Sequence, residues 1–239
     1  MKIKPFVIHL ARATQRRAQV QQLLNRLGPD SQIVDAVDGA ALSKAELAAA
    51  YQPNLHAPRY PFALRPGEIG CFLSHRNVWE TFLASDAEAA LILEDDVELN
   101  EDFDAALWLA QRHVDEIGYI QLQTRTCDGD VIDRQGGYAL IRPQITPLRT
   151  SGQLVSRIAA KQLLDATDPF DRPVDTFLQM HWYTGLHLGV VTPACLIDRT
   201  AETGGSTIGV SKPLLEKLQR EWKRTSYRAR VKRHSKSNN

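Results

Sequence analysis

The chain of 239 residues has few cysteines and no long apolar run. Its three cysteines, Cys71, Cys127 and Cys195, are odd in number and far apart, so they form no recognisable metal-ligand spacing and no disulfide framework. This usage is typical of a reducing compartment. The first apolar run, residues 6–10, is too short for a signal peptide, and no stretch approaches the roughly 20 apolar residues of a membrane span. We therefore expect a cytoplasmic protein.

The chain also lacks a large net charge, because the opposite charges of its two parts nearly cancel. The formal net charge is +1, yet the residues from Lys212 onward hold ten basic and two acidic side chains, which leaves 19 basic and 26 acidic residues in the rest. The 43% apolar and 24% charged composition is that of an ordinary soluble domain. We predict a domain over residues 1–211 and a basic, partly amphipathic tail over residues 212–239.

A basic amphipathic segment suits an anionic membrane surface, where each basic residue near the surface adds about 1 kcal/mol. We expect the tail to hold the protein peripherally against the inner face of the cytoplasmic membrane. Two alternatives remain for the tail. It could be a solvated, disordered end, or it could bind nucleic acid. The acidic body disfavours nucleic acid, and we expect no such partner.

Strands alternating with helices predict an α/β fold, here a mainly parallel sheet flanked by helices. Ser43 and Glu46 form a capping-box pattern ahead of a short helix. Two long loops are expected, over residues 52–66 and 124–147, the second with a hairpin or a mobile segment. The expected strands cover residues 6–10, 32–37, 89–93, 119–123, 153–156 and 185–191, and the expected helices cover residues 15–27, 67–83, 103–117 and 158–164.

The most informative segment is Ala89–Val97, in which five apolar residues run directly into Glu94, Asp95 and Asp96. The apolar run has the length of a strand buried on both faces, and the acids then fall at its carboxyl end, where open α/β sheets bind ligands. Clustered carboxylates suit Mg²⁺ or Mn²⁺, which in turn hold phosphates. The segment therefore predicts a metal–diphosphate site. The alternative is a set of solvated acids at a strand end or in the first turn of a helix.

Several segments together resemble glycosyltransferase family 25, the lipopolysaccharide and lipooligosaccharide glycosyltransferases. The resemblance runs from about residue 3 to about residue 209, and its most specific part is the pair formed by residues 67–75 and 91–97. This chain has His9 where the family usually has Asn, and Ala11 where Asp is common. The segments are Val-Ile-His-Leu at 7–10 with Arg16, Asp-Ala-Val-Asp-Gly at 35–39, Gly-Glu-Ile-Gly-Cys-Phe-Leu-Ser-His at 67–75, Leu-Ile-Leu-Glu-Asp-Asp-Val at 91–97, Ser-Arg at 156–157 with Ala160, and Pro-Val-Asp at 173–175.

The resemblance implies a GT-A-like (Rossmann-type) fold, a nucleotide-sugar donor, a divalent cation and inversion at the anomeric carbon. It makes Asp96 the first candidate metal ligand, with Glu94 beside it. A late histidine, His181 or preferably His187, is a further candidate ligand. The donor-binding residues implied by the matched segments are His9, Leu10, Arg16, Ala36, Asp38, Glu68, Ser74, Glu94 and Asp95.

Removal of the acceptor proton needs a carboxylate across the sugar from the diphosphate. Asp175 matches the family's late Pro-Val-Asp and is the expected base, with Asp168 and Asp171 as rivals in the same loop. The alternative for Asp175 is a helix cap. His75 is a candidate catalytic donor to the diphosphate or the sugar, although a lone helical histidine is more often structural.

We therefore expect a glycosyltransferase that uses Mn²⁺ or Mg²⁺ and inverts configuration. It would move a hexose, with galactose as first choice, from a UDP-sugar to a lipooligosaccharide or related glycan. A catalytically silent nucleotide- or glycan-binding protein attached to the membrane is the alternative from another class, and a metal-dependent phosphohydrolase is a lesser one.

Overall fold

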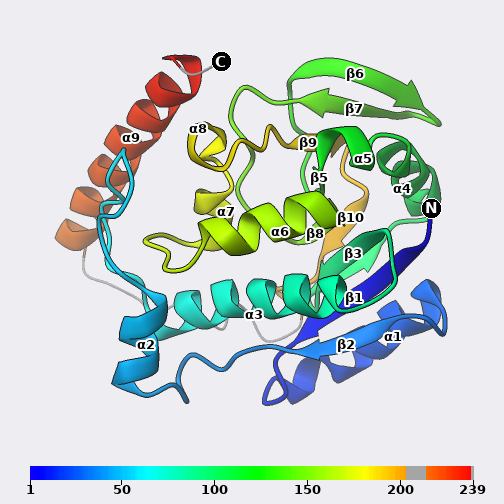
Figure 1. Ribbon diagram of the computed structural model, residues 1–239, viewed down its shortest axis with the longest axis horizontal. Coiled ribbons are helices and arrows are strands. Elements are labelled where there is room, and N and C mark those ends of the chain that lie inside the picture. Colours follow the sequence, from blue (N-terminus) through cyan, green and yellow to red (C-terminus); the bar gives the residue numbers. More distant parts are fainter. Residues whose placement is uncertain (203–213, 238–239) are drawn as a thin grey trace.

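A single eight-stranded sheet lies between two layers of helices in the computed structural model (Figure 1). The structure describes residues 1–202 and 214–237, of which residues 214–219 and 237 are described by their backbone alone. The strand order is β2-β1-β3-β8-β5-β9-β7-β6, and a separate two-stranded sheet pairs β10 with β4. The strands are β1 Ile3–His9, β2 Gln32–Asp35, β3 Ala89–Glu94, β4 Val97–Leu99, β5 Tyr119–Leu122, β6 Asp130–Gln135, β7 Tyr138–Arg142, β8 Gly152–Ser156, β9 Gly189–Thr192 and β10 Leu196–Asp198.

The helices cover both faces of the sheet, which confirms the expected GT-A-like α/β architecture. They are α1 Arg17–Leu27, preceded by the 3-10 turn η1 Thr14–Arg16, then α2 Lys44–Ala50, α3 Pro66–Leu83, α4 Phe103–Gln111, α5 Val114–Ile117, α6 Arg157–Ala166, α7 Val174–Phe177, α8 His181–Thr184 and α9 Leu214–Ser237.

The sheet is mixed rather than mainly parallel. Strands β2, β1 and β3 run parallel, but β8 runs antiparallel between β3 and β5. The β6–β7 hairpin reverses the chain, and residues 143–151 then lead from β7 into β8, which runs in the same direction as β7. This reversal brings the loop before β8 to the carboxyl end of β3.

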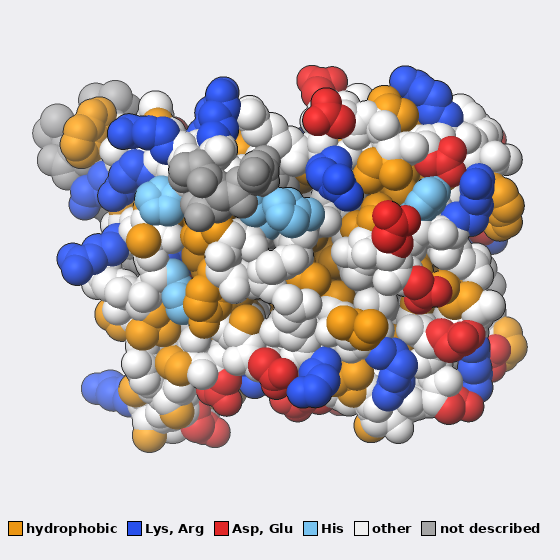
Figure 2. All heavy atoms as spheres, turned by 45° about the horizontal axis from the view of Figure 1, so that its top comes forward, with side chains coloured by type: hydrophobic (Ala, Val, Ile, Leu, Met, Phe, Trp, Pro, Cys, Tyr) orange, Lys and Arg blue, Asp and Glu red, His pale blue; other side chains and the backbone are white. Residues whose placement is uncertain are grey.

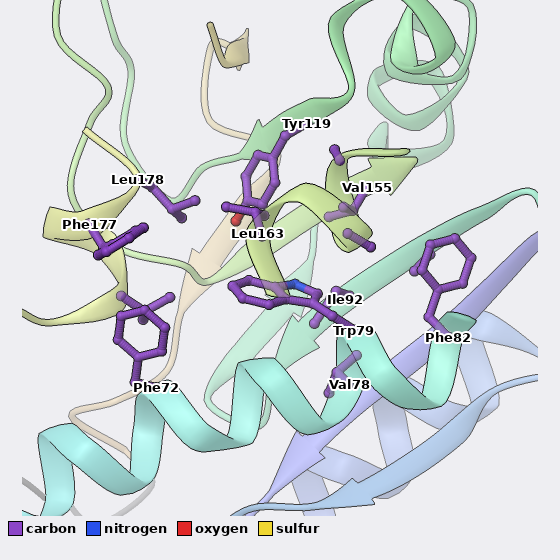
Figure 3. Close-up of a cluster of buried hydrophobic side chains, with 14 of the residues drawn as sticks. Phe72, Val78, Trp79, Phe82, Ile92, Tyr119, Val155, Leu163, Phe177 and Leu178 are labelled. Carbon is purple, nitrogen blue, oxygen red and sulfur yellow. The ribbon is translucent and has the colours of Figure 1, made fainter. Parts of the chain in front are cut away.

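The apolar run of β3 is buried on both faces because each face of the sheet has its own helical layer. Ala90 and Ile92 belong to the core beneath α3 and α6, whereas Leu91 and Leu93 belong to the core beneath α1 and α4. Figure 3 shows the first core, with Trp79 of α3 beside Leu163 of α6 and Phe72 of α3 beside Phe177 of α7. The strand thus needs apolar residues at every position, and it has no polar side chain until Glu94.

Several elements differ in detail from the expectation. The helix expected over residues 103–117 is divided into α4 and α5 at Arg112 and His113, where His113 bonds Asp133 of β6 at 2.8 Å. The late strand begins only at Gly189, because residues 181–184 form α8. The loop 124–147 contains the β6–β7 hairpin. The capping box of Ser43 and Glu46 is present as expected.

The carboxyl-terminal segment forms α9, which lies along the body at the left of Figure 1. Tyr227, Val231 and Ser235 are buried against the body, so a disordered end is wrong for residues 214–237. The exposed side of α9 is basic, and Figure 2 shows Lys and Arg side chains gathered over this part of the molecule. The expected boundary between residues 211 and 212 lies outside the described residues. Within the described chain, no helix combines the length and apolar character needed to cross a bilayer.

Candidate active site

Strands β1, β2 and β3 end at one edge of the sheet, and their last residues bring the expected donor-binding segments together. Because the three strands are parallel, His9 pairs with Asp35 and Ile8 pairs with Glu94. The loop before β8 joins this edge through a hydrogen bond from the Glu94 amide to the Ser151 carbonyl at 3.0 Å. The acidic segment therefore lies at the carboxyl edge of the parallel strands, which is where open α/β sheets bind their ligands.

Asp95 points into the protein. Its Oδ2 atom lies 2.7 Å from His9 Nδ1 and accepts a hydrogen bond from the Leu10 amide at 3.4 Å, while its Oδ1 atom accepts one from Arg16. All three side chains of the His9–Asp95–Arg16 group are buried. Both oxygens are thus used within the protein, and Asp95 supports the site rather than facing a ligand.

Asp96 also contacts Arg16 but is more exposed than Asp95. Its Oδ2 atom lies 3.2 Å from Arg16 Nη1 and accepts a hydrogen bond from Thr200 Oγ1 at 3.1 Å. Burial and the charge of Glu94 together raise the pKa of Asp96 to about 6, against the opposing effect of Arg16. Asp96 therefore carries negative charge that its surroundings only partly compensate.

Glu94 lies between α3 and the loop before β8. Its Oε1 atom accepts a hydrogen bond from Thr150 Oγ1 at 2.6 Å and lies 3.5 Å from His75 Nε2. Burial opposes ionisation of Glu94, but the hydrogen bonds and charge of His75 and the Thr150 hydroxyl outweigh it, so the pKa of Glu94 is lowered. His75, itself buried, thus keeps Glu94 ionised.

The pair Glu94 and Asp96 fits a hard divalent cation. Mg²⁺ and Mn²⁺ are commonly held by one or two carboxylates together with substrate phosphates, and these two acids repel one another strongly enough to raise the pKa of Asp96. Asp95 is not available as a third ligand, because both of its carboxylate oxygens bind groups of the protein.

His187 does not join this pair. It precedes β9, whose Gly189 pairs with Ile120 at the amino end of β5. Since β3 and β5 both lie antiparallel to β8 in matching register, this is the end of the sheet where β3 begins, and Glu94 ends β3 at the other edge. The imidazole of His187 instead lies 4.4 Å from that of His181, centroid to centroid. The placement contradicts the expectation of His187 as a metal ligand.

Asp175 lies in α7 and faces the same region as Glu94. Its carboxylate accepts hydrogen bonds from the amides of Arg149 at 3.1 Å and Thr176 at 2.6 Å. Burial raises the pKa of Asp175 above its ordinary value despite these hydrogen bonds, and the charge of Glu94 contributes to the increase. A partly exposed carboxylate with a raised pKa suits a general base.

The two rivals of Asp175 are placed differently. Asp171 is fully buried and pairs with Arg172, whose Nε lies 2.7 Å from its Oδ1. Asp168 is exposed and lies 3.8 Å from Arg76 on the outer side of α3. Of the three, Asp175 is the carboxylate whose surroundings include Glu94.

The remaining predicted residues lie on the segment after β2 and on the neighbouring helix α3. Ser74 accepts a hydrogen bond from the Val37 amide at 2.8 Å, and the Ala36 amide bonds the His9 carbonyl at 2.8 Å, so the segment after β2 is held between β1 and α3. Asp38 pairs with Arg12 at 2.6 Å. Glu68 accepts a hydrogen bond from the Arg65 amide at 2.8 Å, which is the capping role expected of an acid in a first helical turn.

Three residues of the site were not expected from the sequence. Thr150 and Arg149 belong to the loop before β8, which carries no pattern that predicts a function. Arg149 has a φ of 85°, in the left-handed region that non-glycine residues rarely occupy, and such strain is often found at functional sites. Cys71 lies one helical turn before His75 within the matched segment 67–75, and the signals that could have found it were this match and the spacing of four.

Comparison with known proteins identifies a family of glycosyltransferases. The family model described as glycosyltransferase family 25 (LPS biosynthesis protein) matches residues 2–135. Procollagen galactosyltransferase 2 of Homo sapiens is 32% identical over 187 residues, which cover 72% of this chain and 29% of that protein. Inactive glycosyltransferase 25 family member 3 of Mus musculus is 39% identical over 101 residues, which cover 41% of this chain and 17% of that protein. The crystal structure of S. aureus TarS 1-349 aligns with a TM-score of 0.42 and 13% identity, over 85% of this chain and 62% of that one.

The family match covers more than half of the chain and includes α3, β3 and the acidic segment that ends β3. The chain spans only 29% of the length of the human relative, so the likeness concerns one portion of that longer protein. On the extent of the family match, the chain belongs to glycosyltransferase family 25.

Proposed function

We propose that this protein is a metal-dependent, inverting glycosyltransferase that uses a UDP-sugar donor. The observation that carries the proposal is the placement of Glu94 and Asp96 at the carboxyl edge of the sheet, with Asp175 close enough for its pKa to respond to the charge of Glu94. A pair of acids for a cation and a separate acid for proton removal are the parts that this reaction needs.

Each group has a distinct task. Glu94 and Asp96 would hold Mg²⁺ or Mn²⁺, which supplies Lewis-acid stabilisation of the departing diphosphate. Asp175 removes the proton of the acceptor hydroxyl, and its raised pKa makes it a stronger base than an ordinary aspartate. Arg149 and Thr176 orient the Asp175 carboxylate through their backbone amides. His75 keeps Glu94 ionised and oriented.

The names of the relatives support a choice of transferred sugar and of acceptor. A human relative is named a procollagen galactosyltransferase, and the matching family model is described by lipopolysaccharide biosynthesis. We propose galactose as the transferred hexose and a lipooligosaccharide or related glycan as the acceptor. Because an inverting transfer occurs in one displacement, one base on the acceptor side is sufficient, and Asp175 meets that requirement.

The exposed face of α9 supports a membrane-bound location. Arg228, Lys232 and Lys236 follow one another at helical spacing and are exposed, whereas Tyr227 and Val231 hold the helix to the body. We propose that this face binds anionic lipid, which would keep the enzyme at the inner face of the cytoplasmic membrane beside a lipid-linked acceptor.

The rival proposal, a catalytically silent nucleotide- or glycan-binding protein, is favoured by one observation: a mouse relative is named inactive. A screen of UDP-sugars for Mn²⁺-dependent release of UDP separates the two. We expect release from UDP-galactose, lost on chelation and in Asp96→Asn. UDP binding without release from any donor would favour the rival, and release of phosphate from simple esters would indicate a phosphohydrolase instead.

A further inference from the structure

Cys71, His75 and Glu94 form a compact group of sulfur, nitrogen and oxygen atoms. Cys71 and His75 lie one turn apart on the inner face of α3, and Glu94 ends the neighbouring strand β3. One ligand atom from each residue lies within 4.8 Å of the other two. A small inward movement of side chains would bring all three to the distances found around Zn²⁺, which are about 2.0 to 2.3 Å from metal to ligand.

The surroundings of this group attract a cation. Burial raises the pKa of the Cys71 thiol well above its usual value, and the charges of Glu94, Asp175, Asp96 and Glu68 raise it further. Four carboxylates thus act on one thiol. A divalent cation bound beside Cys71 would be stabilised by the same negative charges.

We propose that Cys71, His75 and Glu94 bind a borderline-soft divalent cation of the Zn²⁺ type, with a fourth position open to water or to a ligand. Three protein ligands and an open position form a common zinc arrangement. The thiolate selects Zn²⁺ over Mg²⁺ and Mn²⁺, which prefer oxygen ligands, so this site differs from the pair Glu94 and Asp96 proposed above. On binding, a metal–sulfur bond replaces the S–H bond of Cys71, and the proton passes to solvent.

Gln153 supplies the support that a histidine ligand needs. Its side chain is fully buried, its Nε2 atom lies 3.3 Å from His75 Nδ1, and its Oε1 atom has no hydrogen-bond partner. A metal on Nε2 of His75 leaves the ring proton on Nδ1, which then needs an acceptor. Rotation of the Gln153 amide presents the unpartnered oxygen to that proton, in exchange for the hydrogen bond that Nε2 donates to the Thr150 carbonyl at 2.9 Å.

Zinc at this site would withdraw Glu94 from the proposed Mg²⁺ or Mn²⁺ site. We therefore expect Zn²⁺ to inhibit sugar transfer in competition with Mn²⁺, a consequence that rests on the proposed function. The binding itself does not rest on it, because the three residues are present whether or not the protein transfers sugar.

Titration of the reduced, metal-free protein with Co²⁺, a spectroscopic substitute for Zn²⁺, tests the site without any donor. Thiolate coordination produces a near-ultraviolet charge-transfer band. We expect one equivalent of Co²⁺ to develop this band and one equivalent of Zn²⁺ to abolish it. Cys71→Ser should remove the band, whereas Cys127→Ser, which removes another partly exposed thiol, should retain it.

Gln153→Ala should weaken Co²⁺ binding by about 10-fold or more, as loss of an outer-shell partner usually does. Absence of the band in the wild-type protein would overturn the proposal, and so would a band of equal intensity in Cys71→Ser. Circular dichroism of each variant checks that it folds. If Gln153→Ala fails that check, the two cysteine variants still decide the result. Failure of this titration leaves the UDP-release screen unaffected, so the two proposals fail separately.

Discussion

Nδ1 of His9 lies 2.7 Å from Oδ2 of Asp95, and both side chains are buried between β1 and the turn after β3. The same carboxylate accepts a hydrogen bond from Arg16. The middle acid of the Glu94–Asp96 segment is therefore a structural group, although its two neighbours face the site. Substitution of Asp95 should consequently lower the stability of the folded protein, whereas substitution of its neighbour Asp96 should raise it.

Asp95→Ala should lower the free energy of unfolding by about 3 to 5 kcal/mol, because the buried His9 and Arg16 side chains lose the carboxylate that they both contact. Urea denaturation followed by circular dichroism measures the change. Asp165→Ala, which removes an exposed acid on α6, is the matched control and should change stability by less than about 1 kcal/mol. A loss for Asp95→Ala no larger than that of the control would contradict the structural role.

Asp96→Asn should stabilise the metal-free protein at pH 7 by about 1 to 3 kcal/mol, since the folded state raises the pKa of this group to about 6. The folded protein binds the Asp96 proton more tightly than the unfolded chain does. The cost of the charge is thus fully present above pH 6, shrinks as the pH falls below 6, and is gone below about pH 4, the ordinary pKa of an aspartate. Denaturation in EDTA at pH 7 and pH 5 should show the advantage of the variant shrinking at the lower pH. An advantage independent of pH would point to another cause.

The same Asp96→Asn variant should lose Mn²⁺-dependent binding of UDP, measured by calorimetry. Protons compete with the cation for this carboxylate, so Mn²⁺ affinity of the wild-type protein should decline as the pH falls below about 6. Unchanged UDP affinity in the variant would reject the proposed metal ligand.

Asp175→Asn should retain donor affinity while lowering the rate of transfer by about 10² to 10⁴-fold, the usual contribution of a general base. Because the pKa of Asp175 is raised, the wild-type rate should begin to fall on acidification at a higher pH than an ordinary aspartate would allow. Asp168→Asn, in the same loop but exposed, is the control. Equal rates in Asp175→Asn and the wild type would place the base elsewhere.

The triple variant Arg228→Gln, Lys232→Gln and Lys236→Gln should bind anionic vesicles more weakly. At about 1 kcal/mol per charge, the expected loss in partitioning is on the order of 100-fold. Sedimentation with vesicles of phosphatidylcholine and phosphatidylserine measures it. A triple Gln variant of the body residues Arg17, Arg134 and Lys161 is the control, and equal partitioning of both variants would remove the membrane role of α9.

Tyr227→Phe tests how α9 is held to the body. The Tyr227 hydroxyl accepts a hydrogen bond at 2.8 Å from Arg172, whose guanidinium also bonds Asp171 and the His56 carbonyl. Loss of the hydroxyl leaves one buried donor unpaired and should cost about 1 to 3 kcal/mol. Chemical denaturation measures the cost. Tyr183→Phe, at an exposed position on α8, is the control; if both changes cost the same, α9 does not depend on this bond.

Much of this protein could be predicted from local patterns. The uninterrupted apolar run ending in Glu94 indicated a doubly buried strand with acids at its carboxyl end, and β3 is that strand. The capping box at Ser43 and the helix beginning near Gly67 are likewise set by neighbouring residues. Such features depend on periodicity and on contacts within one or two turns, which a sequence displays directly.

The tertiary structure decided which of these groups meet. It buried Asp95 and left Asp96 partly exposed, because His9 and Arg16 approach Asp95 from β1 and the turn η1, about 80 positions away in sequence. It reversed β8, which brought Thr150 to Glu94, and it placed His187 at the opposite end of the sheet. Strand direction and register are set by contacts between distant segments, so no local pattern reveals them, and they determine which side chains share an edge.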